Sequence, residues 1–123
     1  DNSRAKRTTT LSWAAAIVEQ RLGPNAISKI SFRMNNIKNA RIGICYHNQV
    51  ESQKFLVLND FGQGAYLHEE DGYICSHSIA DDNRQKKSGV AYRTGEVMTV
   101  ELDPSTGKLT YTNNSSGGLS FTQ

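Results

Sequence analysis

The segment 89–111 constrains the fold more than any other part of this chain, because it contains two strands and the turn between them. From Val97 to Leu102 apolar and polar residues nearly alternate, as in a half-buried strand. The apolar face of that strand is Met98, Val100 and Leu102. A turn follows at Asp103–Gly107, because its proline presets a turn conformation and its glycine supplies a positive φ. Leu109 and Tyr111 resume the alternation, so the segment predicts an antiparallel β-hairpin.

Further short strands are expected along the rest of the chain. Their ranges are 30–34, 40–46, 54–58, 65–68 and 73–77. The last two flank an acidic turn that ends in Asp71-Gly72, a strong hairpin signal. Leu11–Leu22 fits either a helix or a bulged strand, because three alanines favour a helix while the surrounding sequence favours strands. Nothing else indicates a helix, and Ile79–Lys87 has the composition of a polar loop. The pattern predicts an all-β fold, an antiparallel twisted β-sandwich.

Length and charge limit the organisation and the partners. A chain of 123 residues suits one domain. We expect residues 1–7 to be a flexible polar lead-in and residues 8–123 to form the domain. Fourteen basic and 12 acidic residues give a net charge of +2, so charge implies no nucleic acid and no membrane as partner. No apolar run approaches the length of a membrane span.

Cys45 and Cys75 both lie in expected strands, where a reduced cysteine acts as a small apolar residue. Two cysteines are too few for a disulfide framework in a domain of this size. This favours a cytoplasmic location, with the nucleus as the alternative.

The order of these motifs resembles the SPRY domain family, twisted β-sandwiches used for protein recognition. The resemblance covers most of the chain and lies in residues 27–34, 40–45, 64–67, 71–73, 89–97, 101–103 and 107–111. The clearest match is Gly89–Val97, which is similar to the family's Gly-Asp-Val-Ile segment, with Glu96 where aspartate is usual. The family continues into one more strand where this sequence stops at Gln123. The last strand is therefore expected to be missing or truncated, or to be replaced by Thr8–Trp13, and an open sheet edge invites self-association.

The resemblance implies a concanavalin-like jelly-roll sandwich that acts as a non-enzymatic scaffold or adaptor module without a cofactor. Such a domain binds a peptide or a loop of a partner protein through its inter-strand loops. From their positions, the residues expected to contact the partner are His47, Asn48, Gln49, Phe55, Asp82, Asn83 and Arg84. Arg84 can pair with a carboxylate, the asparagines with a peptide backbone, and Phe55 can offer a stacking face.

Three other interpretations remain open. If Asp71 and Gly72 are the central residues of their hairpin, a set of four side chains shares one sheet face; its two histidines and its cysteine are acceptable zinc ligands, and a fourth ligand is not obvious. That set is Tyr66, His68, Cys75 and His77. A lectin-like sandwich needs an exposed aromatic platform, for which Trp13 or Tyr73 would serve. A structural role would use the open sheet edge. Catalytic pairings such as Cys45 with His47 lack an orienting carboxylate, so no enzyme is predicted.

Overall fold

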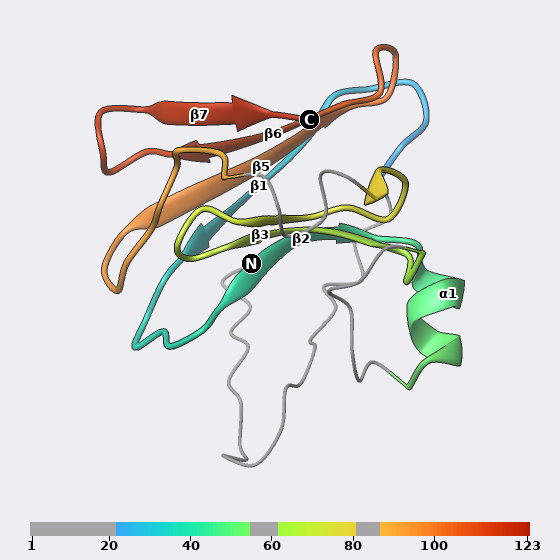
Figure 1. Ribbon diagram of the computed structural model, residues 1–123. Coiled ribbons are helices and arrows are strands. Elements are labelled where there is room, and N and C mark those ends of the chain that lie inside the picture. Colours follow the sequence, from blue (N-terminus) through green and yellow to red (C-terminus); the bar gives the residue numbers. More distant parts are fainter. Residues whose placement is uncertain (1–21, 55–61, 81–86) are drawn as a thin grey trace.

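The computed structural model describes residues 22–54, 62–80 and 87–123, and the strands of these residues form two antiparallel sheets (Figure 1). The first sheet has the strand order β1-β5-β6-β7 and the second the order β2-β3-β4. The elements are β1 (Ser28–Arg33), β2 (Arg41–Cys45), α1 (His47–Ser52), β3 (Ala65–Glu69), β4 (Ile74–Cys75), β5 (Val97–Asp103), β6 (Lys108–Asn113) and β7 (Leu119–Thr122). This confirms the all-β prediction. Among the described residues no helix is long and apolar enough to cross a membrane.

The β5–β6 hairpin forms where the alternating sequence predicts it. Leu102 lies opposite Leu109, and Val100 lies opposite Tyr111. The Asp103 carboxylate holds the turn: one oxygen accepts hydrogen bonds from the backbone N–H and the hydroxyl of Ser105, and the other accepts one from Thr106. Gly107 has a φ of +68°, a backbone conformation that residues with a side chain rarely adopt. Local turn chemistry therefore fixes the register of this hairpin.

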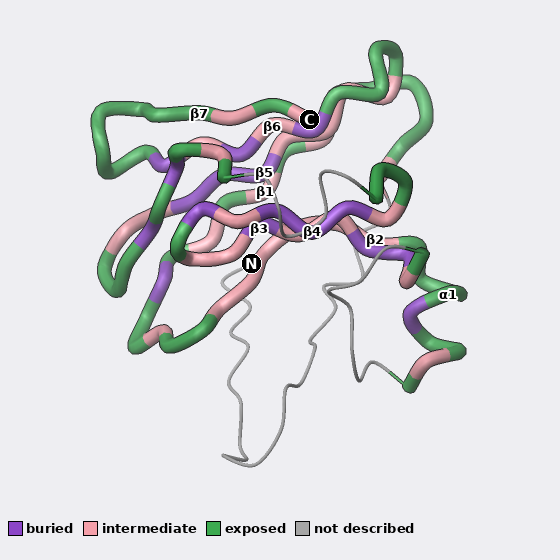
Figure 2. Tube along the Cα trace, viewed as in Figure 1, coloured by how far each residue is buried: buried purple, intermediate pink, exposed green. Residues whose placement is uncertain are grey.

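Buried and half-buried residues follow one another along β3, β4 and β5 (Figure 2), and apolar residues of both sheets pack into one core. Its buried members are Met34, Val90, Tyr92, Met98, Val100, Leu109 and Tyr111. The second sheet contributes Ile42, Ile44 and Tyr66, which pack against this cluster. The opposite face of the first sheet is polar, with hydroxyl pairs such as Ser31–Thr99 at 2.8 Å. The two sheets thus form a sandwich with one shared core.

The chain between β4 and β5 is held against the second sheet by Tyr92. The backbone N–H of Tyr92 donates to the carbonyl of Glu70 at 2.9 Å. The buried Tyr92 hydroxyl lies 2.9 Å from two backbone carbonyls, those of Ala40 and His68. One side chain therefore links this connection to both β2 and β3.

Some predicted elements differ from the structure or lie outside the part it describes. The prediction of no helix beyond Leu11–Leu22 is wrong, because α1 follows β2 directly. Lys54 has a φ of +55°, which is not extended backbone, and the other residues of the predicted strand 54–58 lie outside the described residues. The lead-in 1–7, the segment Leu11–Leu22 and most of the polar loop 79–87 also lie outside them.

Candidate functional site

The residues expected to bind a partner after the second strand lie on a short helix rather than in a loop. His47, Asn48 and Gln49 form the first turn of α1, and all three are exposed. Val50 is fully buried and anchors the helix. His47 Nε2 lies 3.7 Å from the Glu51 carboxylate, one turn along the helix. A helix of six residues is too short for its apolar periodicity to be visible, so sequence reasoning missed it.

Three aromatic rings meet beside the start of α1. Tyr46 directly precedes the helix, Tyr66 lies on β3, and His77 follows β4. The ring centroids are 6.3 Å apart for Tyr46 and Tyr66, 5.4 Å for Tyr46 and His77, and 6.0 Å for Tyr66 and His77. Every pair is edge-to-face, the favourable arrangement for aromatic rings. We call these three residues and Ser78 the Tyr46 patch.

Hydrogen bonds fix the geometry of the Tyr46 patch. The backbone N–H of Gly64 donates to Nδ1 of His77 at 3.0 Å, so the neutral imidazole carries its proton on Nε2. The Tyr66 hydroxyl donates to the Ser78 hydroxyl at 2.9 Å. The N–H of Tyr46 donates to the Gly64 carbonyl at 2.7 Å. The rings are therefore held by the strands beneath them.

Tyr46 is the exposed ring of the patch, with 55% of its surface accessible, whereas Tyr66 and His77 are half-buried. The charge of the neighbouring Tyr66 raises the pKa of Tyr46, and a hydrogen-bond contribution from Tyr66 and partial burial add to the effect. The Tyr46 hydroxyl therefore stays protonated at neutral pH and can donate a hydrogen bond. The patch thus offers an exposed ring with a neutral polar group at its tip.

Gly64 allows α1 to lie close to the start of β3. A Cβ at Gly64 would lie 2.6 Å from Oε1 and 2.7 Å from Cβ of Gln49, and the φ of Gly64 is +86°. Only glycine combines this backbone conformation with room for the glutamine side chain. Gln49 therefore packs onto the turn that also carries the His77 hydrogen bond, which joins α1 to the Tyr46 patch.

The possible metal-ligand set does not assemble, because the β3–β4 register differs by one residue from the expected one. Leu67 pairs with Cys75 and His68 with Ile74, so His68 and Cys75 lie on opposite faces of the sheet. The hairpin loop has three residues, 70–72, and Gly72 has a φ of +93°. Within the described residues no cluster of His, Cys, Asp and Glu side chains could hold a metal ion.

His68 instead points into the core. It is fully buried, with its ring centroid 4.9 Å from that of Tyr111 and 5.8 Å from that of Tyr92. Its Nε2 is 2.7 Å from the Ser88 hydroxyl. Burial lowers the pKa of His68 from 6.5 to about 4, so the ring is neutral at pH 7. His68 is therefore a structural residue of the core.

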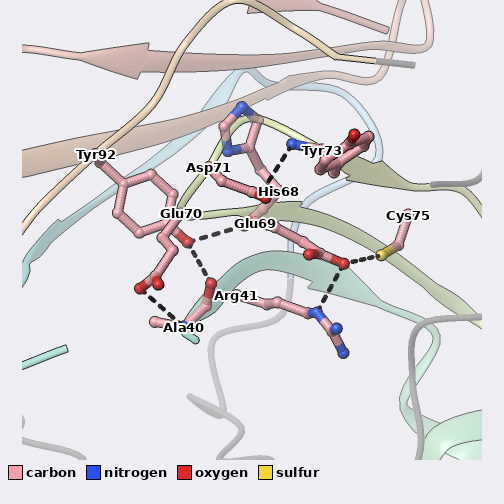
Figure 3. Close-up of polar contacts among 9 residues, drawn as sticks. All are labelled: Ala40, Arg41, His68, Glu69, Glu70, Asp71, Tyr73, Cys75 and Tyr92. Carbon is pink, nitrogen blue, oxygen red and sulfur yellow. Dashed lines mark hydrogen bonds and ion pairs between the residues drawn. The ribbon is translucent and has the colours of Figure 1, made fainter. Parts of the chain in front are cut away.

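The carboxylates of the acidic segment at the end of β3 form contacts with other residues of the protein (Figure 3). Glu69 Oε1 lies 3.0 Å from Nε of Arg41 and 3.4 Å from Sγ of Cys75. Glu70 accepts a hydrogen bond from the N–H of Ala40, and Asp71 accepts one from the N–H of Tyr73. These carboxylates hold β2, β3 and β4 together, which explains the acidic sequence of the turn without a catalytic role.

The two thiols are structural as well. Cys75 is buried and Cys45 half-buried. Burial raises the pKa of the Cys45 thiol, and Cys75 donates towards a carboxylate. Neither environment favours the thiolate that a nucleophile needs.

The other expected contact residues, Phe55, Asp82, Asn83 and Arg84, lie outside the described residues. Of the expected set, the structure therefore describes His47, Asn48 and Gln49, and it brings them next to Tyr46. Sequence reasoning missed Tyr46 as a site residue. A signal was present, because Tyr46 directly precedes His47, but its contacts with Tyr66 and His77 depend on strand pairing.

Comparison with known proteins gives no family for this chain: no family model, no curated protein and no solved structure matches it.

Proposed function

We propose that the protein is a non-enzymatic interaction module that binds a peptide or a loop of a partner protein at the Tyr46 patch and the first turn of α1. The exposed Tyr46 ring carries the proposal, because two further rings hold it in one orientation. A rigid tyrosine gives a large contact area at a small cost in entropy, and tyrosines are enriched among the residues that dominate binding energy.

Polar groups around Tyr46 suit recognition of a peptide backbone. The Nε2–H of His77 and the Tyr46 hydroxyl can donate to carbonyls, and the exposed Asn48 amide can both donate and accept. Donors beside an aromatic ring are the usual composition of a small peptide site. We expect Phe55, Asp82, Asn83 and Arg84 to extend this surface. Affinity in the micromolar range, about −8 kcal/mol, suits a contact of this size.

We further propose that the module is SPRY-like, and the order of the sequence motifs together with the antiparallel two-sheet sandwich supports this. Scaffold and adaptor proteins use such domains without cofactors. The low cysteine content, two residues in a domain of this size, supports a cytoplasmic or nuclear location, where thiols stay reduced.

The experiment is affinity capture from a cell lysate with the wild-type domain and a Tyr46→Ala variant, read by mass spectrometry. Ile27→Ala is the matched control, because Ile27 is also an exposed large apolar residue (63%) but precedes β1 on the other sheet. The proposal expects a protein retained by the wild type and the control and lost by Tyr46→Ala. Equal capture by all three folded proteins, or no specific capture, would contradict it.

A lectin-like function is the second candidate, because an exposed tyrosine ring near Asn48 also resembles a sugar platform. Of the two rings proposed for this role from the sequence, only that of Tyr73 lies among the described residues. Trp13 lies outside them, and the Lys87 ammonium lies 4.7 Å from the centroid of the Tyr73 ring and covers one of its faces. Saturable binding on a glycan array that Tyr46→Ala abolishes would favour the lectin over the peptide module.

A further inference from the structure

The last strand of the first sheet, β7, lies at the edge of the sandwich (Figure 1) and has one side paired with β6. Leu109 and Gln123 exchange both backbone hydrogen bonds, each 2.9 Å long. Because paired positions alternate along an antiparallel ladder, the backbones of Leu119 and Phe121 also face β6. The N–H and C=O groups of Ser120 and Thr122 therefore point away from the sheet.

In the described part of the chain, the edge of β7 is less protected than the edges of β1 and β4. The strand reads Leu-Ser-Phe-Thr, with no charge and no proline. The opposite edge, β1, carries Lys29 and Arg33, whose charges oppose pairing with a like strand. One edge strand of the second sheet, β4, has only two residues, and the chain before it bridges to Lys87.

We propose that the β7 edge pairs with β7 of a second copy of this chain, antiparallel and about a two-fold axis at Phe121. In this register Ser120 lies opposite Thr122 of the second copy, and Thr122 lies opposite Ser120. Both positions present their backbone groups outward, so each pair exchanges two N–H···O bonds. The two four-stranded sheets then continue into one another.

A second copy fits this edge because the strand is complementary to itself. In a two-fold symmetric contact every pair of residues occurs twice. Here each outward N–H of Ser120 and Thr122 meets an outward C=O of the second copy. Serine and threonine on the outer face are a favourable cross-strand pair. No like charges of β7 meet across the axis. The pairing also brings Leu119, which is 55% exposed, opposite Gln123 of the second copy and reduces its contact with water.

Sedimentation velocity over a range of concentrations tests the dimer with a Ser120→Pro/Thr122→Pro variant. Proline removes only the outward N–H groups and leaves the β6–β7 bonds, so the variant should keep the wild-type circular dichroism spectrum. The matched control, Ser120→Ala/Thr122→Ala, changes the same side chains but retains the N–H donors. The proposal expects dimers for the wild type and the alanine control, and a dissociation constant at least about tenfold higher for the proline variant.

A Ser120→Cys/Thr122→Cys variant tests the register independently, including the case in which the proline variant does not fold. Oxidation should give a dimer whose intermolecular disulfide joins position 120 to position 122, as located by mass spectrometry of peptides. A monomeric wild type at the highest concentration reached would overturn the proposal. It would also be overturned by a folded proline variant that dimerises like the wild type, or by cross-links only through Cys45.

Discussion

The hydroxyl of Tyr111 on β6 donates a hydrogen bond to the backbone carbonyl of Tyr66 on β3, at 3.0 Å, and so joins the two sheets through the core. Burial raises the pKa of Tyr111, so its hydroxyl stays protonated and remains a donor. Tyr66 carries one of the rings that hold Tyr46. The packing of the sandwich and the position of the candidate site therefore depend on the same residue.

Tyr111→Phe removes this bond and leaves the carbonyl of Tyr66 without that donor. We expect the free energy of unfolding to fall by about 1–2 kcal/mol, the usual cost of a buried hydrogen bond lost on one side. Urea unfolding followed by circular dichroism measures it. Tyr73→Phe is the control, because Tyr73 is only half-buried, and it should change stability by less than about 0.5 kcal/mol. Equal midpoints for wild type and Tyr111→Phe would show that the bond contributes nothing.

His68 makes stability depend on pH. Burial lowers its pKa from 6.5 to about 4, so the folded state favours the neutral ring. The contribution is therefore fully present above pH 6.5 and is lost as the pH falls towards 4, by a total of about 3 kcal/mol. Unfolding free energies of the wild type and His68→Gln, measured from pH 7 to pH 4, should differ in slope over this window. The carboxylates titrate in both proteins, so the difference between the two curves reports on His68 alone. Curves of equal slope would contradict the lowered pKa of His68.

Gly43→Ala should disrupt the second sheet. A Cβ at Gly43 on β2 would overlap the carbonyl oxygen of Tyr66, and a backbone atom within a strand cannot move aside cheaply. We expect a loss of about 3 kcal/mol or more, seen as a lower midpoint of thermal or urea unfolding. Gly23→Ala is the matched control, since a Cβ there meets nothing within 4 Å. A variant as stable as the control would mean that β2 and β3 are not packed as described.

The β5–β6 hairpin was predictable because all its determinants are local. Alternation gives the buried face, and Asp103 with Gly107 fixes the turn within a few residues. The pairing of β1 with β5 is different: Ile30 lies opposite Val100, far along the chain. No local pattern encodes such a pair, which depends on how the apolar faces of all the strands pack together.

The candidate site was predictable only in part, because it also depends on contacts between residues that are distant in the sequence. The sequence Asp71-Gly72 is compatible with a two-residue or a three-residue loop, and the structure uses the longer one. The one additional loop residue shifts the β3–β4 register, which places His68 and Cys75 on opposite faces of the sheet and removes the expected metal-ligand face. Tyr46 gains its importance from rings on β3 and after β4, which are adjacent to it only once the sheet has formed.

The central claim, that the Tyr46 patch is the binding surface, is tested most directly by NMR titration of the labelled domain with the captured partner segment. The account predicts that the largest chemical-shift changes fall in residues 46–49, 64–66 and 77–78 and disappear in Tyr46→Ala. Changes confined to β1 or to β7, with these residues unaffected, would contradict it.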